Sequence, residues 1–178
     1  MNNFFKQQDI CWLNKNIKPR SWGSNPKYYE ILKFLIKEQP DILPNNPILK
    51  NIEFKKNITN LLIKLFYTGD WACSNLLLNS TFSKLIDFSN SDLKIFAFIH
   101  LEKILKPRKN SNTLDQLTKR NITKFIRHIL MILEKFNFQT KEINKLKDIF
   151  LRRMLFEQKN IEVCHKLQQF YNELYDKK

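Results

Sequence analysis

Leucine, isoleucine and phenylalanine recur at every third or fourth position through most of this chain. Between residues 113 and 136 this spacing places one apolar stripe at Ile122, Phe125, Ile126, Ile129, Leu130, Leu133 and Phe136. Residues three and four apart share one face of an α-helix, whereas a strand with one buried face alternates apolar and polar side chains. Sustained alternation is absent from the sequence. The pattern therefore predicts an all-α protein.

Glycine is almost absent, because Gly23 and Gly69 are the only two in 178 residues. This scarcity excludes glycine-rich phosphate loops and argues against a β-sandwich dense in tight turns. Val163 is the single valine, so the apolar content is leucine, isoleucine and phenylalanine. Composition and spacing thus favour helices together.

Capping residues mark the ends of several expected helices. Gly69 is expected just after a helix end, and Asp70, Ser80 and Ser91 are expected N-caps. Thr113 and Gln116 form a capping-box pattern before a long helix that reaches about Phe136. The helices are expected to begin near Pro26, Ile52, Asp70, Ser80, Ser91, Thr113, Thr140 and Asn160.

The chain is expected to form one domain after a short lead. Residues 1–25 are poorly patterned, and residues 26–178 are predicted to be a single α-helical domain. Inside it, 39–48 is a proline-rich connector and 106–112 is a charged linker, since proline disfavours a helix across it.

The order of features between residues 70 and 105 resembles an armadillo or HEAT repeat. The segments are DWACSNLLL, then FSKLIDF, a corner SNSD, and the longer LKIFAFIHLEKIL. Ser80 stands where the armadillo pattern prefers glycine. The resemblance implies a short, right-handed HEAT- or armadillo-like stack, and the alternative is a compact helical bundle; either would contain about seven to nine helices. The same region is also similar to the small helical domain at the N-terminus of transcription elongation factors.

A basic face is the best functional candidate in the sequence. The net charge is +14, and nine lysines and arginines accompany two acids between Lys103 and Lys135. Within the expected long helix Arg120, Lys124 and Arg127 follow the spacing i, i+4 and i+7, which is expected to align them on one face opposite the apolar stripe. The candidate binding residues are Lys119, Arg120, Lys124, Arg127, Arg152 and Arg153. A solvated face in a lysine-rich protein is the alternative interpretation.

The residues that catalysis or metal binding requires do not form a recognisable motif. His100 and Glu102 would need a Cys-x-x-Cys pair to match a zinc deaminase, and the sequence has none. His100 is expected at a helix surface or in a satisfied core contact. Adjacent Cys164 and His165 would point about 100° apart on a helix. We predict no catalytic residues, no cofactor and no metal.

These observations predict a non-enzymatic helical interaction module, a subunit or adaptor of a larger assembly. Its basic face is expected to bind an acidic protein or the backbone of nucleic acid. The alternatives are a direct, sequence-nonspecific DNA- or RNA-binding protein and an enzyme whose site the sequence does not reveal. No membrane-spanning segment is expected. Three widely spaced cysteines favour a reducing intracellular compartment, either nucleus or cytoplasm, and leave a mitochondrial location open.

Overall fold

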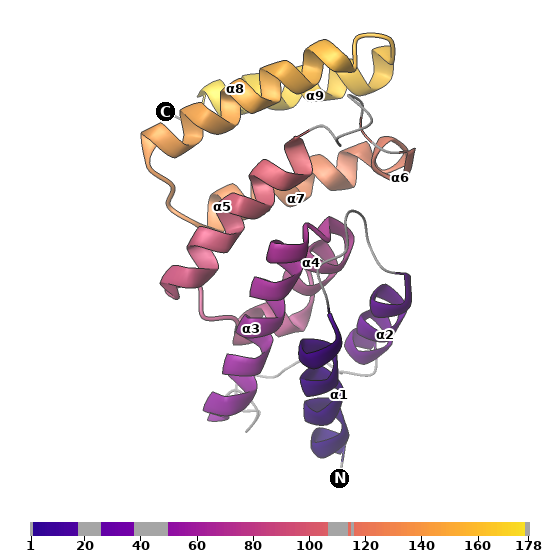
Figure 1. Ribbon diagram of the computed structural model, residues 1–178, viewed down its shortest axis with the longest axis vertical. Helices are drawn as coiled ribbons and strands as arrows, with labels where there is room; N and C mark the ends of the chain where they lie inside the picture. The colour runs from indigo at the N-terminus through magenta and orange to yellow at the C-terminus, as the bar shows by residue number, and fades with distance from the viewer. Residues whose placement is uncertain (1, 18–25, 38–49, 107–113, 115, 177–178) are drawn as a thin grey trace. The chain divides into compact units, whose positions relative to one another are not determined.

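The computed structural model describes residues 2–17, 26–37, 50–106, 114 and 116–176, and most of these residues are helical (Figure 1). They contain nine α-helices, one short 3-10 helix and no strand, which confirms the all-α prediction of seven to nine helices. The helices are α1 (Asn2–Asn16), α2 (Pro26–Lys37), α3 (Ile52–Thr68), α4 (Trp71–Leu78), the 3-10 helix η2 (Thr81–Leu85), α5 (Ser91–Leu105), α6 (Gln116–Arg120), α7 (Ile122–Lys135), α8 (Thr140–Phe156) and α9 (Ile161–Asp176).

The chain divides into two compact units, Met1–His100 and Leu101–Lys178. The boundary falls inside α5, so each unit is described by itself. A single domain over residues 26–178 stays a prediction. The expected connector 39–48 lies outside the described residues, as does the expected linker 106–112 apart from Lys106.

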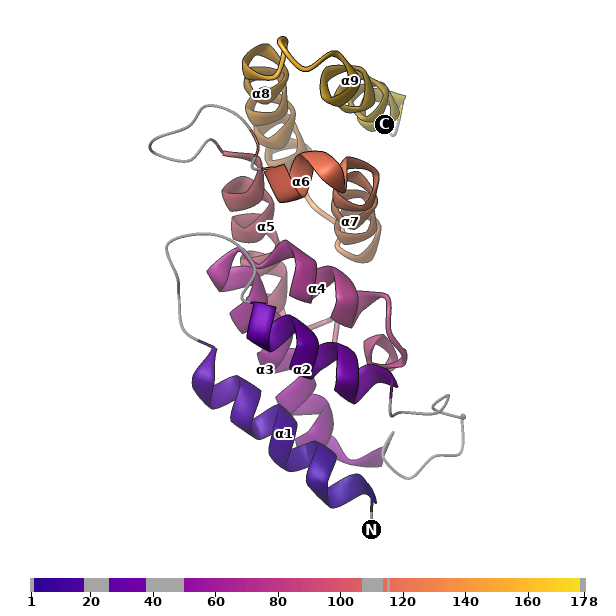
Figure 2. The ribbon, with the colours of Figure 1, turned by 90° about the vertical axis from the view of Figure 1, so that its right-hand side faces the viewer.

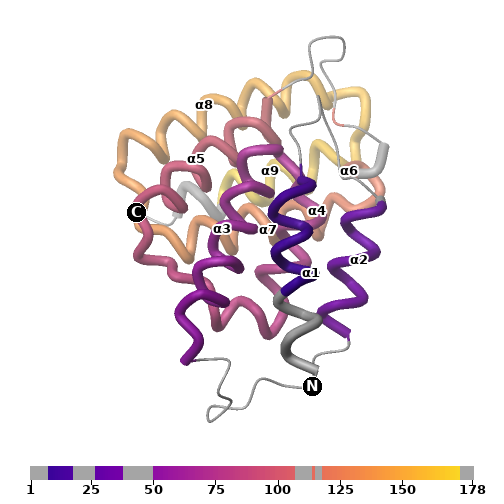
Figure 3. The backbone as a smooth tube through the Cα atoms, turned by 60° about the horizontal axis from the view of Figure 1, so that its bottom comes forward, coloured from indigo at the N-terminus to yellow at the C-terminus, as the bar shows by residue number. Residues whose placement is uncertain are grey.

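Helix α3 is the centre of the first unit. It begins after Asn51, whose side chain accepts a hydrogen bond from the Phe54 backbone N–H at 2.9 Å. It ends at Gly69, where φ is 74° and ψ is 21°. Helices α1 and α4 pack on α3, and α2 packs on α4 (Figures 2 and 3). The buried α3 side chains are Phe54, Ile58, Thr59, Leu61, Leu62, Leu65 and Phe66.

Helix α1 lies within the segment that the sequence suggested was poorly patterned. Its described apolar contacts to the core come from Ile10 and Leu13, with Ile17 just beyond its end. Trp12 is 39% exposed and sits between them in sequence, which weakens the periodic pattern. The Asn14 side chain donates to the Asn57 backbone oxygen at 2.8 Å. Tertiary contacts thus support a helix that sequence spacing did not predict.

The segment after α4 departs from the expected amphipathic α-helix beginning at Ser80. Ser80 does cap the segment, since its hydroxyl accepts from the Phe82 N–H at 3.2 Å. The helix that follows is of the 3-10 type and ends at Leu85, because Ile86 is extended with φ −78° and ψ 129°. Helix α5 is capped by Asn90, whose side chain accepts from the Leu93 N–H, and the predicted cap at Ser91 is wrong.

The second unit contains the end of α5 and helices α6 to α9. Helices α8 and α9 pack as neighbours, with the rings of Phe150 and Phe170 4.7 Å apart (Figure 1). Helix α7 packs on α9. The capping box of α8 joins the Gln139 N–H to the Glu142 carboxylate at 2.7 Å.

The long helix predicted up to Phe136 is interrupted. Helix α6 ends at Arg120, and Asn121 has a φ of −116° and a ψ of 28° before α7 begins. The predicted capping residue Thr113 and the Gln116 side chain lie outside the described part.

Candidate binding surface

Four of the six predicted binding residues are exposed. Arg120 ends α6, Lys124 and Arg127 lie on α7, and Arg152 lies on α8. Within the part of the chain that the structure describes, none of the four side chains pairs with a carboxylate. Their charge is therefore available to an external anion.

The break at Asn121 changes the predicted alignment of three cations. Lys124 and Arg127 remain three residues apart on α7 and share its exposed face. Arg120 belongs to a separate helix, so the i, i+4 relation to Lys124 does not apply. The Lys166 ammonium donates to the Thr123 hydroxyl at 3.3 Å, which places α9 beside this end of α7.

Arg153 does not belong to the exposed surface. It is 2% exposed, and its guanidinium donates from Nε to the Leu105 backbone oxygen at 2.8 Å. The Nη2 atom of Arg153 donates to the same oxygen at 2.5 Å. The prediction that Arg153 belongs to a binding face is corrected, because the side chain is turned into the second unit and holds the end of α5.

Lys119 is largely engaged inside the protein. Its ammonium lies 3.3 Å from a carboxylate oxygen of Glu157, and 16% of the Lys119 side chain is exposed. Glu157 is buried and also accepts a hydrogen bond from the Leu114 backbone N–H. Lys119 therefore neutralises a buried carboxylate, and its predicted role as a binding cation is corrected.

An exposed apolar cluster accompanies Arg152, and the sequence analysis did not identify it. Leu151, Leu155 and Phe156 are 38%, 64% and 42% exposed on the last turns of α8. Leu151 and Leu155 are four residues apart and share one face, while Phe156 and Arg152 are also four apart. We call these three apolar residues together with Arg152 the α8 surface. The opposite side of α8 is buried through Leu146, Phe150, Arg153 and Met154.

His100 and the Cys73 thiol both lie in the core of the first unit. His100 is fully buried, with its ring 4.7 Å from Phe66 and Nε2 3.5 Å from the Ser74 hydroxyl. Burial raises the pKa of the Cys73 thiol well above its usual range, and the nearby Asp70 carboxylate raises this pKa further. Cys73 therefore stays protonated and is a poor nucleophile. Of the two positions expected for His100, a helix surface or the core, the structure places it in the core.

The described residues contain no group of three or more histidine, cysteine, aspartate or glutamate side chains placed to hold a metal ion. Among the described helices, none has the length and apolar character that crossing a membrane requires. Neither finding identifies a ligand, so the exposed cations and the α8 surface remain the features to explain.

No protein-family model, curated protein or solved structure matches this chain significantly. The armadillo or HEAT resemblance of residues 70–105 therefore stays a prediction.

Proposed function

We propose that this chain is a non-enzymatic helical interaction module that binds an acidic protein surface as a subunit or adaptor of a larger assembly. The observation that carries the proposal is the α8 surface, where Arg152 is exposed among Leu151, Leu155 and Phe156. Protein interfaces are enriched in arginine and aromatic residues, and their centres bury apolar side chains. A phosphate backbone alone offers such leucines no apolar contact.

The charge of the module favours an acidic partner. The chain carries a net charge of +14, and within the described residues the exposed Arg120, Lys124 and Arg127 have no carboxylate partner. Such a field increases the rate at which an anionic surface is encountered and discourages basic partners. The apolar residues would supply most of the affinity, and the cations would supply selectivity.

Direct nucleic-acid binding is the second candidate, and one observation favours it. The described side chains of α6 and α7 include no large exposed apolar group near Arg120, Lys124 and Arg127. Isolated cations of this kind suit phosphate contacts, which fix position without reading sequence. The two candidates thus depend on different residues.

The proposed setting is a reducing compartment inside the cell. Cys11, Cys73 and Cys164 are all free thiols. Secreted proteins of this size usually pair their cysteines, whereas intracellular proteins keep them reduced.

The test is affinity purification of the full chain with and without nuclease, using three variants. The apolar variant carries Leu151→Ser and Leu155→Ser, and the basic variant carries Arg120→Glu, Lys124→Glu and Arg127→Glu. The control variant carries Phe34→Ser and Ile95→Ser, which alter residues that are 62% and 57% exposed elsewhere. Retained proteins are then compared across all samples.

An acidic protein that survives nuclease, is lost with the apolar variant and is kept by the control variant supports the proposal. Loss of every partner after nuclease overturns it in favour of nucleic acid. In that case binding of a labelled oligonucleotide should weaken steeply with salt and fail in the basic variant. Equal retention by all three variants also overturns it.

A further inference from the structure

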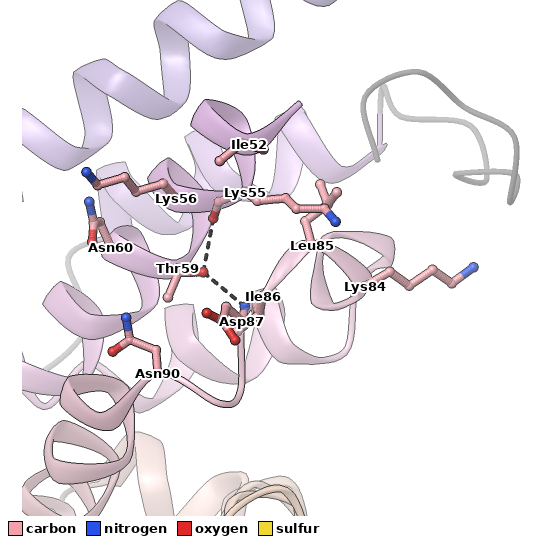
Figure 4. Close-up of a pocket in the computed structure, with 10 residues that line it drawn as sticks. All are labelled: Ile52, Lys55, Lys56, Thr59, Asn60, Lys84, Leu85, Ile86, Asp87 and Asn90. Carbon is pink, nitrogen blue, oxygen red and sulfur yellow. Dashed lines mark hydrogen bonds between the residues drawn. The ribbon is translucent and has the colours of Figure 1, made fainter. Parts of the chain in front are cut away.

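An open groove crosses the first unit between α3 and the segment 84–90 (Figure 4). Its volume is about 450 Å³. One wall is the first half of α3, and the other contains the end of η2 and the extended residues after it. Its lining includes the aliphatic side chains Ile52, Leu85 and Ile86 and the cations Lys55, Lys56 and Lys84.

Thr59 fixes the two walls of this groove to each other. Its hydroxyl donates to the Lys55 backbone oxygen at 3.0 Å and accepts from the Asp87 backbone N–H at 3.1 Å. Because Thr59 is only 3% exposed, this link is shielded from water. The groove is therefore built into the fold before any ligand arrives.

The groove is cationic at its rims. Asp87 is the one carboxylate among the described lining residues, and it accepts hydrogen bonds from the Ser89 N–H at 3.0 Å and from the Ser89 hydroxyl at 2.5 Å. Among the described residues, neither the Lys55 ammonium nor the Lys56 ammonium pairs with a carboxylate. Figure 4 shows Lys56 beside Asn60 at one end and Lys55 and Lys84 toward the other.

Between these cations lies an aliphatic residue that packing does not explain. Ile52 is 82% exposed, although it borders the same groove as the buried side chains of Leu85 and Ile86. A ligand that matches this arrangement carries an apolar group at its centre and negative charges on both sides. Among the described residues that line the groove none is aromatic, so these residues offer no stacking platform of the kind on which single-stranded nucleic acids rely.

We propose that this groove binds an acidic peptide segment, with an aliphatic side chain of the peptide against Ile52 and its carboxylates near Lys55, Lys56 and Lys84. The site lies in the first unit and shares no residue with the α8 surface. It therefore goes beyond the function proposed above and does not depend on it.

Fluorescence anisotropy on the full chain tests the proposal. The probe is a labelled heptapeptide of glutamates with one central leucine, and the competitor is an unlabelled oligo(dT). The groove variant carries Lys55→Glu, Lys56→Glu and Lys84→Glu. Its matched control carries Lys15→Glu, Lys33→Glu and Lys37→Glu, which change the net charge equally at exposed positions in the same unit. Circular dichroism confirms that each variant is folded.

We expect the groove variant to bind the probe at least about tenfold more weakly, whereas the control loses about threefold or less through the general field. Ile52→Ser should weaken binding by about fivefold, because one partly buried aliphatic contact is lost. A probe with serine in place of leucine should then be insensitive to Ile52→Ser. The basic variant of α6 and α7 serves as a second control and should behave like the first.

Equal weakening by the groove variant and its charge-matched control would overturn the proposal, because it would show only nonspecific attraction. An oligo(dT) that displaces the probe and is itself lost in the groove variant would assign the groove to nucleic acid instead. If Ile52→Ser still weakened binding of the probe that carries serine, the proposed contact between Ile52 and the central leucine would be overturned.

Discussion

The guanidinium of Arg153 holds the backbone carbonyl oxygen of Leu105, with Nε 2.8 Å from that oxygen. Leu105 is the last residue of α5, and carbonyls at a helix end have no partner within the helix. A cation at this position also interacts favourably with the negative end of the helix dipole. Arg153 therefore fastens α8 to the end of α5.

Replacing Arg153 should destabilise the second unit strongly. Arg153→Ala removes both hydrogen bonds to Leu105 and leaves a cavity, so the free energy of unfolding should fall by about 2–4 kcal/mol. Arg152→Ala is the matched control, because Arg152 is exposed and should change stability by less than about 0.5 kcal/mol. Urea unfolding followed by circular dichroism measures both. Similar losses in the two variants would contradict a structural role for Arg153.

The stability of the protein should depend on the pairing of Glu157 with Lys119. Glu157 is buried, pairs with Lys119 at 3.3 Å and accepts from the Leu114 N–H. Glu157→Ala leaves the Lys119 ammonium and the Leu114 N–H without their acceptor, so the free energy of unfolding should fall by about 2–4 kcal/mol. Lys119→Met leaves the buried carboxylate without its cation. The two changes should be coupled by about 1 kcal/mol or more in a double-mutant cycle. Strictly additive losses would show that the pair does not act as a unit.

The helix boundaries set by local chemistry were predictable from the sequence. Gly69 was expected after a helix end, and it has the positive φ of 74° that glycine adopts without strain. Asp70 was expected to cap the next helix, and its carboxylate accepts from the Cys73 N–H at 3.0 Å. Both signals involve residues only a few positions apart, so they do not depend on tertiary structure.

The 3-10 helix η2 shows why helix type was harder to predict. Phe82 and Leu85 are buried and three residues apart, which is a spacing that α-helices and 3-10 helices share on one face. The pattern therefore indicated a helix without distinguishing its kind. The extended backbone at Ile86, which opens the groove, is fixed instead by the contact between Asp87 and Thr59.

The sequence could not show which of the six cations are exposed, because the exposure of a cation depends on partners distant in sequence. Arg153 is hydrogen-bonded to Leu105, and Lys119 pairs with Glu157. In each pair the two residues lie far apart in the sequence. A signal for the α8 surface was present in the i, i+4 spacing of Leu151 and Leu155. These two lie opposite Leu146 and Phe150, so α8 carries a second apolar stripe that a single core does not require.

The turn between α3 and α4 should tolerate only residues that accept a left-handed backbone. Gly69→Ala places a Cβ at φ 74° and should lower the free energy of unfolding by about 1–2 kcal/mol. Gly69→Asn should cost less, because asparagine adopts this conformation more readily. Thermal unfolding of the three proteins provides the ranking, and an alanine variant as stable as the glycine protein would contradict it.

Cys73 should make stability depend on pH in the alkaline range. Burial raises the pKa of its thiol in the folded protein, with a further contribution from Asp70, whereas the unfolded thiol loses its proton near pH 8.5. The favourable contribution of the protonated thiol is therefore complete below about pH 8.5 and is lost as pH rises above it. Between about pH 7.5 and 9.5 this should lower the free energy of unfolding by about 1.4 kcal/mol relative to Cys73→Ala.

Urea unfolding of the wild type and Cys73→Ala at both pH values measures this difference, because contributions from Cys11 and Cys164 are common to the two proteins. The same burial should protect Cys73 from a thiol reagent in the folded state. Cys11 and Cys164 are partly exposed and should react first, with Cys73 reacting only after unfolding. Fast labelling of Cys73 in the native protein, or parallel pH profiles for the two proteins, would show that the thiol is not held in the core.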